Sequence, residues 1–270
     1  MPELPEVETV RRGLERLLLG QTIVRVEIRE PRLRRPLAPD FAGLLTGRTI
    51  EQIKRRGKYL HFGLDNQQVW LVHLGMTGQL IVDEPAAALL PHDHILVFLQ
   101  NARRLRYHDP RRFGLMLIGE EQDLSACTGL GVEPLSRDFN VRYLWAKTQA
   151  TQRTIKDLLM NQRVVAGIGN IYANEILFRA RVRPTWMSAT LSLDAVTRIV
   201  KATKVVLREA IRYRGSSISD YRDGEGNPGS FQDRFYVYNR EGQCCRRCHT
   251  PIRRETCGGR SAYFCPTCQC

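Results

Sequence analysis

The sequence predicts an α+β protein with several domains: an N-terminal antiparallel β-sandwich with a leading helix, then a helical domain, then a small cysteine-rich β-hairpin. Three observations support this prediction. Short β-rich runs broken by turn residues fill roughly the first 120 residues. Helical periodicity takes over after the stretch LGVEPLSRDF. Seven of the eight cysteines lie between Cys244 and Cys270, so the C-terminus is a module with its own means of cohesion.

A helix is expected at the N-terminus, with strands after it. The positions Val7, Val10, Leu14 and Leu17 repeat at helical spacing, and Gly20 ends the pattern. The runs that follow are rich in β-branched and aromatic residues: KYLHFGL, QVWLVHLGM, HILVFLQ and RRLRYHD. We place this first domain at residues 1–130.

The rest of the chain is expected to be a linker, a helical domain and a C-terminal cysteine module, at residues 131–150, 151–234 and 235–270. One helix would carry Ile155, Leu158 and Leu159 on its apolar face, and the turn VVAGIGN would lead to the next. Helices joined by a short glycine-containing turn are typical of DNA-binding helix-turn-helix units. Ser192 can cap a longer helix, and the glycine-rich residues 214–230 are expected to form a mobile loop or linker.

The charge balance points to a polyanionic partner. The chain carries 41 Lys and Arg against 28 Asp and Glu, a formal charge of +13, and clustered cations gain affinity by releasing counterions from phosphate backbones. A merely basic enzyme surface is the alternative. No run approaches the roughly 18 apolar residues of a membrane span, and the start MPELPEVETVRR lacks the pattern of a secretory signal. A cytosolic location is therefore expected, where cysteines serve metals more often than disulfides.

The cysteine spacing predicts a structural zinc site. Two Cys-x2-Cys pairs, Cys245 with Cys248 and Cys265 with Cys268, can complete a tetrahedral Zn²⁺ site. Four thiolates leave no open position, so the metal would be structural and not catalytic. Other possible ligands stay open at this point: Cys244, Cys257, Cys270 and His249.

The first residues suggest covalent chemistry. Removal of Met1 would free the secondary amine of Pro2, which can form an iminium with a sugar carbon. An α-amine has a pKa near about 8, so a useful neutral fraction exists at physiological pH. Glu3 and Glu6 place carboxylates within reach for proton transfer. The alternative is an ordinary helix start with solvated acidic residues.

The chain closely resembles bacterial formamidopyrimidine-DNA glycosylases over nearly its whole length. The motifs that carry the resemblance occur in order: MPELPEVETVRRGL, RRGKYL, LVHLGMTG, PHDH, HDPRRFG, LGVEPL, VVAGIGNIYANEILF, GNPGSFQ, FYVYNREGQCCRRC and GRSAYFCPTC. The start PELPE is more similar to this family than to endonuclease VIII, which typically begins PEGPE. The helical domain would then be of the helix-two-turn-helix type.

The resemblance implies a bifunctional DNA glycosylase and AP lyase that removes oxidised purines, chiefly 8-oxoguanine and formamidopyrimidines, from duplex DNA. Pro2 would be the nucleophile at C1′, Glu3 the acid/base and Glu6 a supporting residue. Strand cleavage would follow by β,δ-elimination. The resemblance also implies a monomer in the bacterial cytoplasm, associated with the nucleoid through DNA.

Further residues match the family by motif. Lys58 corresponds to a lysine beside the lesion, and Arg260 to an arginine at the tip of the zinc hairpin that grips phosphates. The residues that would fill the void left by a flipped base are Met76, Arg111 and Phe113. The residues that would contact phosphate or the lesion strand are His92, Asn170 and Lys156. Residues 221–229 match a loop that closes over the flipped base.

Two rival interpretations remain at this stage. One is an oxidised-pyrimidine enzyme similar to endonuclease VIII. The other is a zinc-ribbon DNA-binding regulator without chemistry, which would leave Pro2 and Glu3 unexplained. The sequence also departs from the family where His249 replaces the usual glycine after the second cysteine, and where Cys257 and Cys270 add thiols.

Overall fold

A computed structural model of the protein describes residues 1–216 and 229–269. The chain divides into two compact units, one formed by Met1–Thr128 with Tyr213–Ser230 and the other by Gly129–Arg212 with Phe231–Cys270. The expected loop over the flipped base, apart from its last residue, lies outside the described residues. The domain boundaries expected from the sequence stay predictions.

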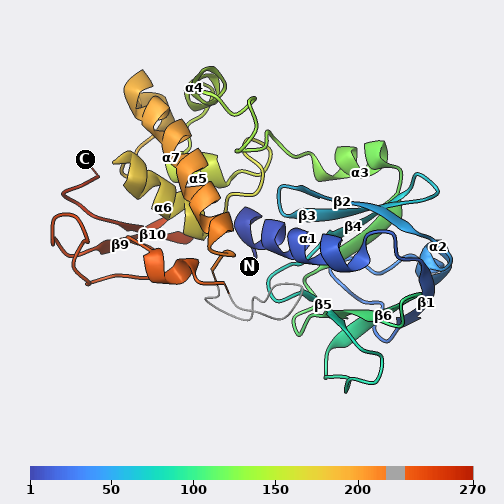
Figure 1. Cartoon of the computed structure of the whole chain (residues 1–270). Coiled ribbons are helices and arrows are strands. Elements are labelled where there is room, and N and C mark those ends of the chain that lie inside the picture. The colour runs from blue at the N-terminus through green and yellow to red at the C-terminus, as the bar shows by residue number, and fades with distance from the viewer. Residues whose placement is uncertain (217–228, 270) are drawn as a thin grey trace. The chain divides into compact units, whose positions relative to one another are not determined.

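The first unit is a sandwich of two antiparallel sheets (Figure 1). One sheet has the order β1-β6-β7-β5 and the other β2-β3-β4-β8. The strands are β1 (Ile23–Ile28), β2 (Ile50–Arg56), β3 (Tyr59–Leu64), β4 (Val69–His73), β5 (Gln79–Asp83), β6 (Asp93–Leu99), β7 (Arg104–His108) and β8 (Leu115–Gly119), and the helices are α1 (Leu4–Leu18), α2 (Phe41–Leu45) and α3 (Glu121–Thr128). The predicted β-sandwich with a leading helix is confirmed.

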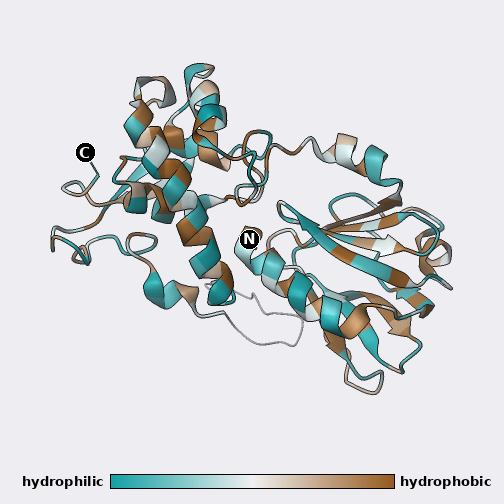
Figure 2. Ribbon diagram, turned by 45° about the horizontal axis from the view of Figure 1, so that its top comes forward, coloured by the Kyte–Doolittle hydropathy of each residue, from teal (hydrophilic) through white to brown (hydrophobic). Residues whose placement is uncertain are grey.

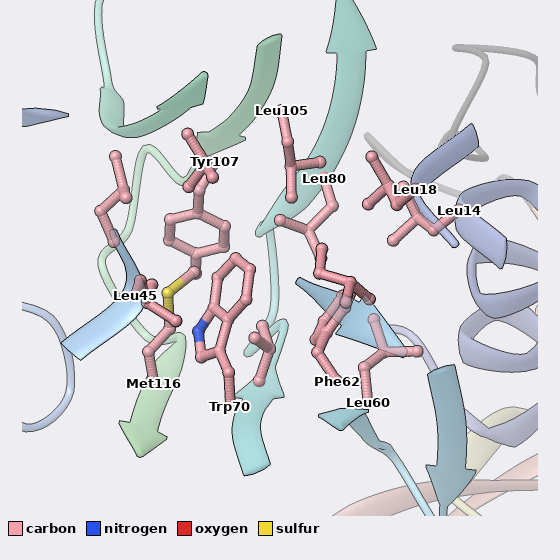
Figure 3. Close-up of a cluster of buried hydrophobic side chains, with 14 of the residues drawn as sticks. Leu14, Leu18, Leu45, Leu60, Phe62, Trp70, Leu80, Leu105, Tyr107 and Met116 are labelled. Carbon is pink, nitrogen blue, oxygen red and sulfur yellow. The ribbon is translucent and has the colours of Figure 1, made fainter. Parts of the chain in front are cut away.

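The core of this unit lies between the two sheets and under α1. Trp70 of β4 stacks on Phe62 of β3 with ring centroids 4.7 Å apart, and both side chains are fully buried. Figure 3 shows Tyr107 of the other sheet beside Trp70, and Leu14 of α1 belongs to the same cluster. Burying one such side chain contributes roughly 1.5–3 kcal/mol. The sandwich therefore provides a rigid base for the chain's first residues.

Helix α1 begins at once because its first turn is capped. Glu3 and Glu6 form a reciprocal capping box, in which each carboxylate accepts a hydrogen bond from the other residue's backbone N–H. Pro5 stands in the first turn, where its missing N–H is not needed. Gly20 follows the helix with φ +74°, which is the predicted end.

The second unit is helical and then forms a hairpin. Its helices are α4 (Val141–Gln149), α5 (Ile155–Met160), α6 (Asn170–Ala180) and α7 (Leu193–Arg212), with short 3-10 turns η1 (Ser188–Thr190) and η2 (Phe231–Arg234). The hydroxyl of Ser192 accepts a hydrogen bond from the Ala195 N–H at 3.2 Å, so the predicted cap of α7 is confirmed. Figure 2 shows apolar and polar residues alternating along α7, as expected for a helix with one buried face.

The segment 131–150 is more ordered than the linker expected from the sequence. Asn140 caps α4 by accepting a hydrogen bond from the Tyr143 N–H at 2.9 Å. Leu144 is fully buried, and the Tyr143 hydroxyl donates to the Val164 carbonyl at 2.9 Å. An asparagine cap and one buried leucine are enough to fix a short helix that shows little periodicity of its own.

The C-terminal strands β9 (Arg253–Cys257) and β10 (Arg260–Phe264) pair as an antiparallel hairpin. Gly258 and Gly259 make the turn with φ of +56° and +72°, values that favour glycine. The predicted α+β fold, with its C-terminal hairpin, is thus confirmed. No helix in residues 1–216 and 229–269 is both long and apolar enough to cross a membrane.

Candidate functional site

The chain's first residues form a buried corner of the sandwich unit. Pro2 is buried, and Glu3 is only 2% exposed. The pKa of the N-terminal amine on Met1 is lowered, chiefly because burial disfavours its charged form. Glu3 and Glu6 act in the opposite direction, while the cation of Lys58 lowers the pKa further. Burial in this corner therefore favours the neutral form of the Met1 amine.

Glu6 links this corner to the segment before residue 217. Its Oε2 accepts the Glu3 N–H at 2.9 Å, and its Oε1 accepts the N–H of Ser216 at 2.7 Å and the Ser216 hydroxyl at 3.1 Å. Gly215 has φ +73°, which favours glycine, and a Cβ there would lie 2.7 Å from the same Oε1, so the Glu6 carboxylate would have to shift. These contacts fix the Glu6 side chain in the corner, and its supporting role in the chemistry stays a prediction.

Lys58 and His73 lie on the same side of this unit. Lys58 follows Gly57 between β2 and β3 and is 5% exposed. Burial and then the positive charges of Lys58 and Arg34 lower the pKa of His73 to about 4. A neutral ring is required here because its Nδ1 accepts the Gly75 N–H at 3.0 Å. His73 therefore fixes the turn that carries Met76.

The three predicted void-filling side chains are exposed on tight turns of the same unit. Met76 is 39% exposed and Phe113 is 45% exposed. The Arg111 guanidinium lies over the Phe113 ring, 4.7 Å from its centroid. His92 is exposed as well and has φ +72°. Large apolar side chains held outward on short turns are suited to contact with a partner, while their roles on DNA stay predictions.

In the second unit, Asn170 opens helix α6. Its Oδ1 is buried without a hydrogen-bond partner among the described residues. The turn before it is held by Gln162, whose side chain accepts the Gly167 N–H at 2.8 Å and donates to the Ile168 carbonyl at 2.7 Å. Backbone N–H groups at the start of such a helix are suited to an anion.

Lys156 and Arg260 meet the hairpin in different ways. Lys156 is fully buried and donates to the Ser261 carbonyl at 3.0 Å. Arg260, one residue earlier, is exposed at the start of β10. Lys156 therefore steadies the strand that carries Arg260, and its predicted contact with DNA remains untested.

The four cysteines predicted as ligands form one cluster. The sulfurs of Cys245, Cys248, Cys265 and Cys268 all lie within 4.8 Å of one another, close to the spacing of about 3.8 Å that a tetrahedral site with Zn–S bonds of 2.3 Å requires. This cluster can hold a metal ion.

The alternative metal ligands either do not belong to the four-cysteine cluster or lie outside the described residues. Cys244 is exposed, and the Cys257 sulfur lies 3.1 Å from the hydroxyl of Thr154. Cys270 is outside the described residues. His249 has φ +62°, which explains why glycine is usual at this position.

Three structurally important residues escaped the sequence analysis. His73 stands inside the quoted motif LVHLGMTG and could have been noticed there. Gln162 gave no signal, because a glutamine before a turn is unremarkable. Glu175 is buried in α6 and accepts three backbone N–H bonds from Tyr236, Val237 and Tyr238, at 2.9, 3.0 and 2.9 Å. Only the fold brings these partners together.

Comparisons with known proteins agree with this geometry. Residues 1–116 match the family described as "Formamidopyrimidine-DNA glycosylase N-terminal domain", and residues 130–222 match "Formamidopyrimidine-DNA glycosylase H2TH domain". The chain is 45% identical over the full length of both chains to the formamidopyrimidine-DNA glycosylase of Thioalkalivibrio sulfidiphilus. It is 47% identical, again over both full lengths, to that of Thiobacillus denitrificans.

Solved structures show the same similarity. A Lactococcus lactis FPG mutant in complex with DNA containing Fapy-dG superposes with a TM-score of 0.92, at 34% identity over 99% of each chain. The MutM (FPG) protein from Thermus thermophilus superposes with a TM-score of 0.88, at 42% identity over 99% of this chain and 98% of that one.

Fold and relatives together define a glycosylase of base-excision DNA repair. The chain belongs to the formamidopyrimidine-DNA glycosylase family, whose members are bifunctional glycosylases and AP lyases. The resemblance stated from the motifs is confirmed, and so is the prediction of an enzyme. The interpretation as a zinc-ribbon regulator without chemistry is wrong.

Proposed function

We propose that the protein excises oxidised purines from duplex DNA through an iminium formed by Pro2, and then cuts the strand by β,δ-elimination. The observation that carries this proposal is the buried N-terminal corner, where the pKa of the terminal amine is lowered mainly by burial. Removal of Met1 would expose the Pro2 amine next to Glu3. A neutral amine in this setting is a nucleophile without further activation.

The residues of the corner fit the successive steps. The Pro2 nitrogen attacks C1′ of the damaged nucleotide and passes its N–H proton to the Glu3 carboxylate, while the base departs with the electron pair of its glycosidic bond and takes up a proton from water. Glu3 then protonates the ring oxygen as the C1′–O bond breaks, which leaves the iminium. Loss of a proton from C2′ expels the 3′ phosphate, and loss of one from C4′ expels the 5′ phosphate. Lys58 lies close enough to the amine to lower its pKa, which supports a role at the lesion or its phosphate.

Duplex DNA is the proposed partner. The formal charge of +13 favours a polyanion, and the similar Lactococcus lactis protein was solved with DNA containing Fapy-dG. Met76, Arg111 and Phe113 would fill the void left by the flipped base, since unstacking must be compensated by an inserted side chain. His92, Asn170, Lys156 and Arg260 would contact the strand.

Zinc is the proposed metal of the four-cysteine cluster. A zinc ion would cross-link the two cysteine pairs that lie before β9 and after β10. It would supply no chemistry on the substrate. Its effect would be to hold β10, and with it the guanidinium of Arg260, in a fixed orientation. A guanidinium on a rigid strand can hold a phosphate with two parallel hydrogen bonds.

Borohydride trapping on a duplex with 8-oxoguanine opposite cytosine tests whether the iminium forms. The protein is made with an N-terminal extension and compared with the same preparation after cleavage to leave Pro2 as the first residue. We expect a protein–DNA adduct only after cleavage, because the extension converts the amine to an amide. An adduct of equal yield from the extended protein would assign the nucleophile to another amine and refute the proposal.

The same assay with two lesions separates the purine and pyrimidine interpretations. We expect faster excision of 8-oxoguanine than of thymine glycol. The opposite order would favour the endonuclease VIII-like alternative and would leave the proposed iminium chemistry intact.

A further inference from the structure

One buried carboxylate in the sandwich unit is not used by the proposed chemistry. Asp109 follows β7 and is completely inaccessible to solvent. Its Oδ1 accepts the Thr77 hydroxyl at 2.5 Å, and its Oδ2 accepts the Tyr107 hydroxyl and the Gly114 N–H, each at 2.9 Å. All three donors are neutral. Among residues 1–216 and 229–269 the Asp109 side chain has no cationic hydrogen-bond partner, and a buried carboxylate is costly unless its neighbours are fixed to satisfy it.

The partners of Asp109 belong to segments that carry exposed side chains. Thr77 directly follows Met76, and Gly114 directly follows Phe113. The backbone N–H of Asp109 also donates to the His92 carbonyl at 3.0 Å. One residue thus connects three turns that are separate in the sequence.

The packing around Asp109 leaves no room for these turns to move independently. A Cβ on Gly75 would lie 2.4 Å from the backbone carbon of Phe113, so the two turns touch backbone to backbone. A Cβ on Gly114 would lie 1.7 Å from the Tyr107 hydroxyl. Burial, and then the charge of Asp109, raise the pKa of Tyr107 well above its usual value, which keeps this hydroxyl a donor.

We propose that Asp109 is the positioning residue that holds Met76, Arg111 and Phe113 in one fixed constellation for filling the void in the duplex. This proposal rests on the proposed function. Exposed side chains on short turns ordinarily sample several orientations. Side chains that are inserted into the duplex to compensate for unstacking are effective only if they already have the required orientation before they bind. The Asp109 carboxylate fixes these turns through its buried hydrogen bonds to Thr77 and Gly114 and does not contact the DNA itself.

The hydroxyl of Thr77 gives the cleanest test, because Thr77→Val removes one hydrogen bond and keeps the side-chain shape. Thr77→Ser retains the hydroxyl and is the matched control. Two reactions are compared: excision of 8-oxoguanine from a duplex, which requires void filling, and β-elimination at an abasic site in single-stranded DNA, which has no void. A 2-aminopurine beside the lesion reports insertion of the void-filling side chains by its fluorescence.

We expect Thr77→Val to slow duplex excision about tenfold or more, as for the loss of one hydrogen bond to a charged acceptor, and to delay the fluorescence change. Single-strand elimination should stay within about twofold of the parent, and Thr77→Ser should behave as the parent in both assays. Equal slowing of both reactions, or no change in either, overturns the proposal. Failure of the parent protein on both substrates would instead refute the proposed function.

Asp109 itself supplies a second comparison. Asp109→Asn can still accept from Tyr107 and Gly114 through its amide oxygen while its amide nitrogen faces the Thr77 hydroxyl. Asp109→Ala leaves all three donors without their acceptor. Each variant is assayed at the same interval below its own melting temperature. We expect the rate of duplex excision to fall much further in the alanine variant than in the asparagine variant. Equal losses in both would overturn the proposal.

Discussion

The N-terminal corner and the C-terminal hairpin hold functional side chains by different physical means. The corner rests on a core that draws on both sheets and α1, including Trp70 and Phe62. Beside the hairpin, a separate cluster of buried residues joins Phe178 of α6 to Val237, Cys245, Ile252 and Cys265. Two members of that cluster are predicted metal ligands. A hairpin of two short strands is only marginally stable by itself and depends on cross-links and buried polar contacts, whereas the corner depends on packing.

The largest expected effect comes from removing one ligand of the hairpin. Cys248→Ser should abolish zinc binding and unfold the hairpin, since structural zinc sites contribute on the order of 10 kcal/mol to the modules that they hold. DNA binding should be lost, while the sandwich unit keeps its unfolding transition. Zinc content by mass spectrometry and calorimetric unfolding measure both effects.

The matched control is Cys244→Ser, because Cys244 is adjacent in sequence to Cys245 and exposed. It should retain the metal and DNA binding. A Cys248→Ser protein with full zinc content would show that another thiol completes the site. It would also contradict the idea that the hairpin depends on these four ligands while the corner depends on packing.

The second prediction addresses the corner. Glu3→Gln should reduce excision by about 10²–10⁴-fold, the usual contribution of a general acid or base, while DNA affinity changes little. Glutamine retains an oxygen that can accept the capping hydrogen bond, so α1 should stay folded. Single-turnover kinetics give the rate, and Glu51→Gln, at an exposed position of β2, serves as the control. An excision rate of Glu3→Gln within threefold of the parent would show that Glu3 is not the general acid or base.

The hairpin was easier to predict from the sequence than the corner. Its ligands lie a few residues apart, so Cys-x2-Cys spacing alone indicates which side chains meet. The corner depends on contacts between distant residues, such as Glu6 with Ser216, which no local pattern encodes. Pro2 and Glu3 were found through the family resemblance, and periodicity would not have singled them out.

Buried polar residues were the main omission for the same reason. Asp109 and Glu175 each collect donors from several segments, and their sequence neighbours give no hint of this. Helix α4 lies inside the predicted linker 131–150, because a helix fixed by one cap and one buried leucine has almost no periodic pattern. Local rules thus predicted elements and the metal cluster, while the polar contacts that orient side chains required the structure.

The third prediction uses pH to probe the packing of the sandwich unit. The pKa of His73 is lowered to about 4 from 6.5, so the unfolded chain takes up a proton before the native protein does. The neutral ring of His73 therefore contributes at most about 3 kcal/mol to the free energy of unfolding. This contribution is fully present above pH 6.5 and is lost as the pH falls towards 4. Denaturant unfolding of the parent should therefore show this decline.

A His73→Asn variant should be less stable at pH 7 and should lose less stability on acidification, because its amide oxygen can accept the Gly75 N–H without titrating. His249→Asn, at an exposed position of the other unit, is the control and should follow the parent. Parallel curves for parent and His73→Asn would contradict the neutral, buried state of this ring.

The smallest expected effect is on the polar anchoring of the hairpin module. Glu175 of α6 accepts N–H groups from Tyr236, Val237 and Tyr238, just before the first cysteine pair. Burial raises the pKa of Glu175 although these hydrogen bonds oppose the shift, so the ionised carboxylate carries a desolvation cost. Glutamine avoids that cost but turns an amide N–H towards at least one backbone donor.

The two changes in Glu175→Gln partly offset each other, and we expect a net loss of only about 1 kcal/mol in the stability of the second unit. Hydrogen exchange of the amides at residues 236–238 should accelerate more than that of α7. Glu209→Gln, which removes a half-exposed partner of Arg179, should cost less than this. If both variants gave the same small loss, the buried carboxylate would add nothing beyond a surface ion pair, and zinc alone would account for the order of the hairpin.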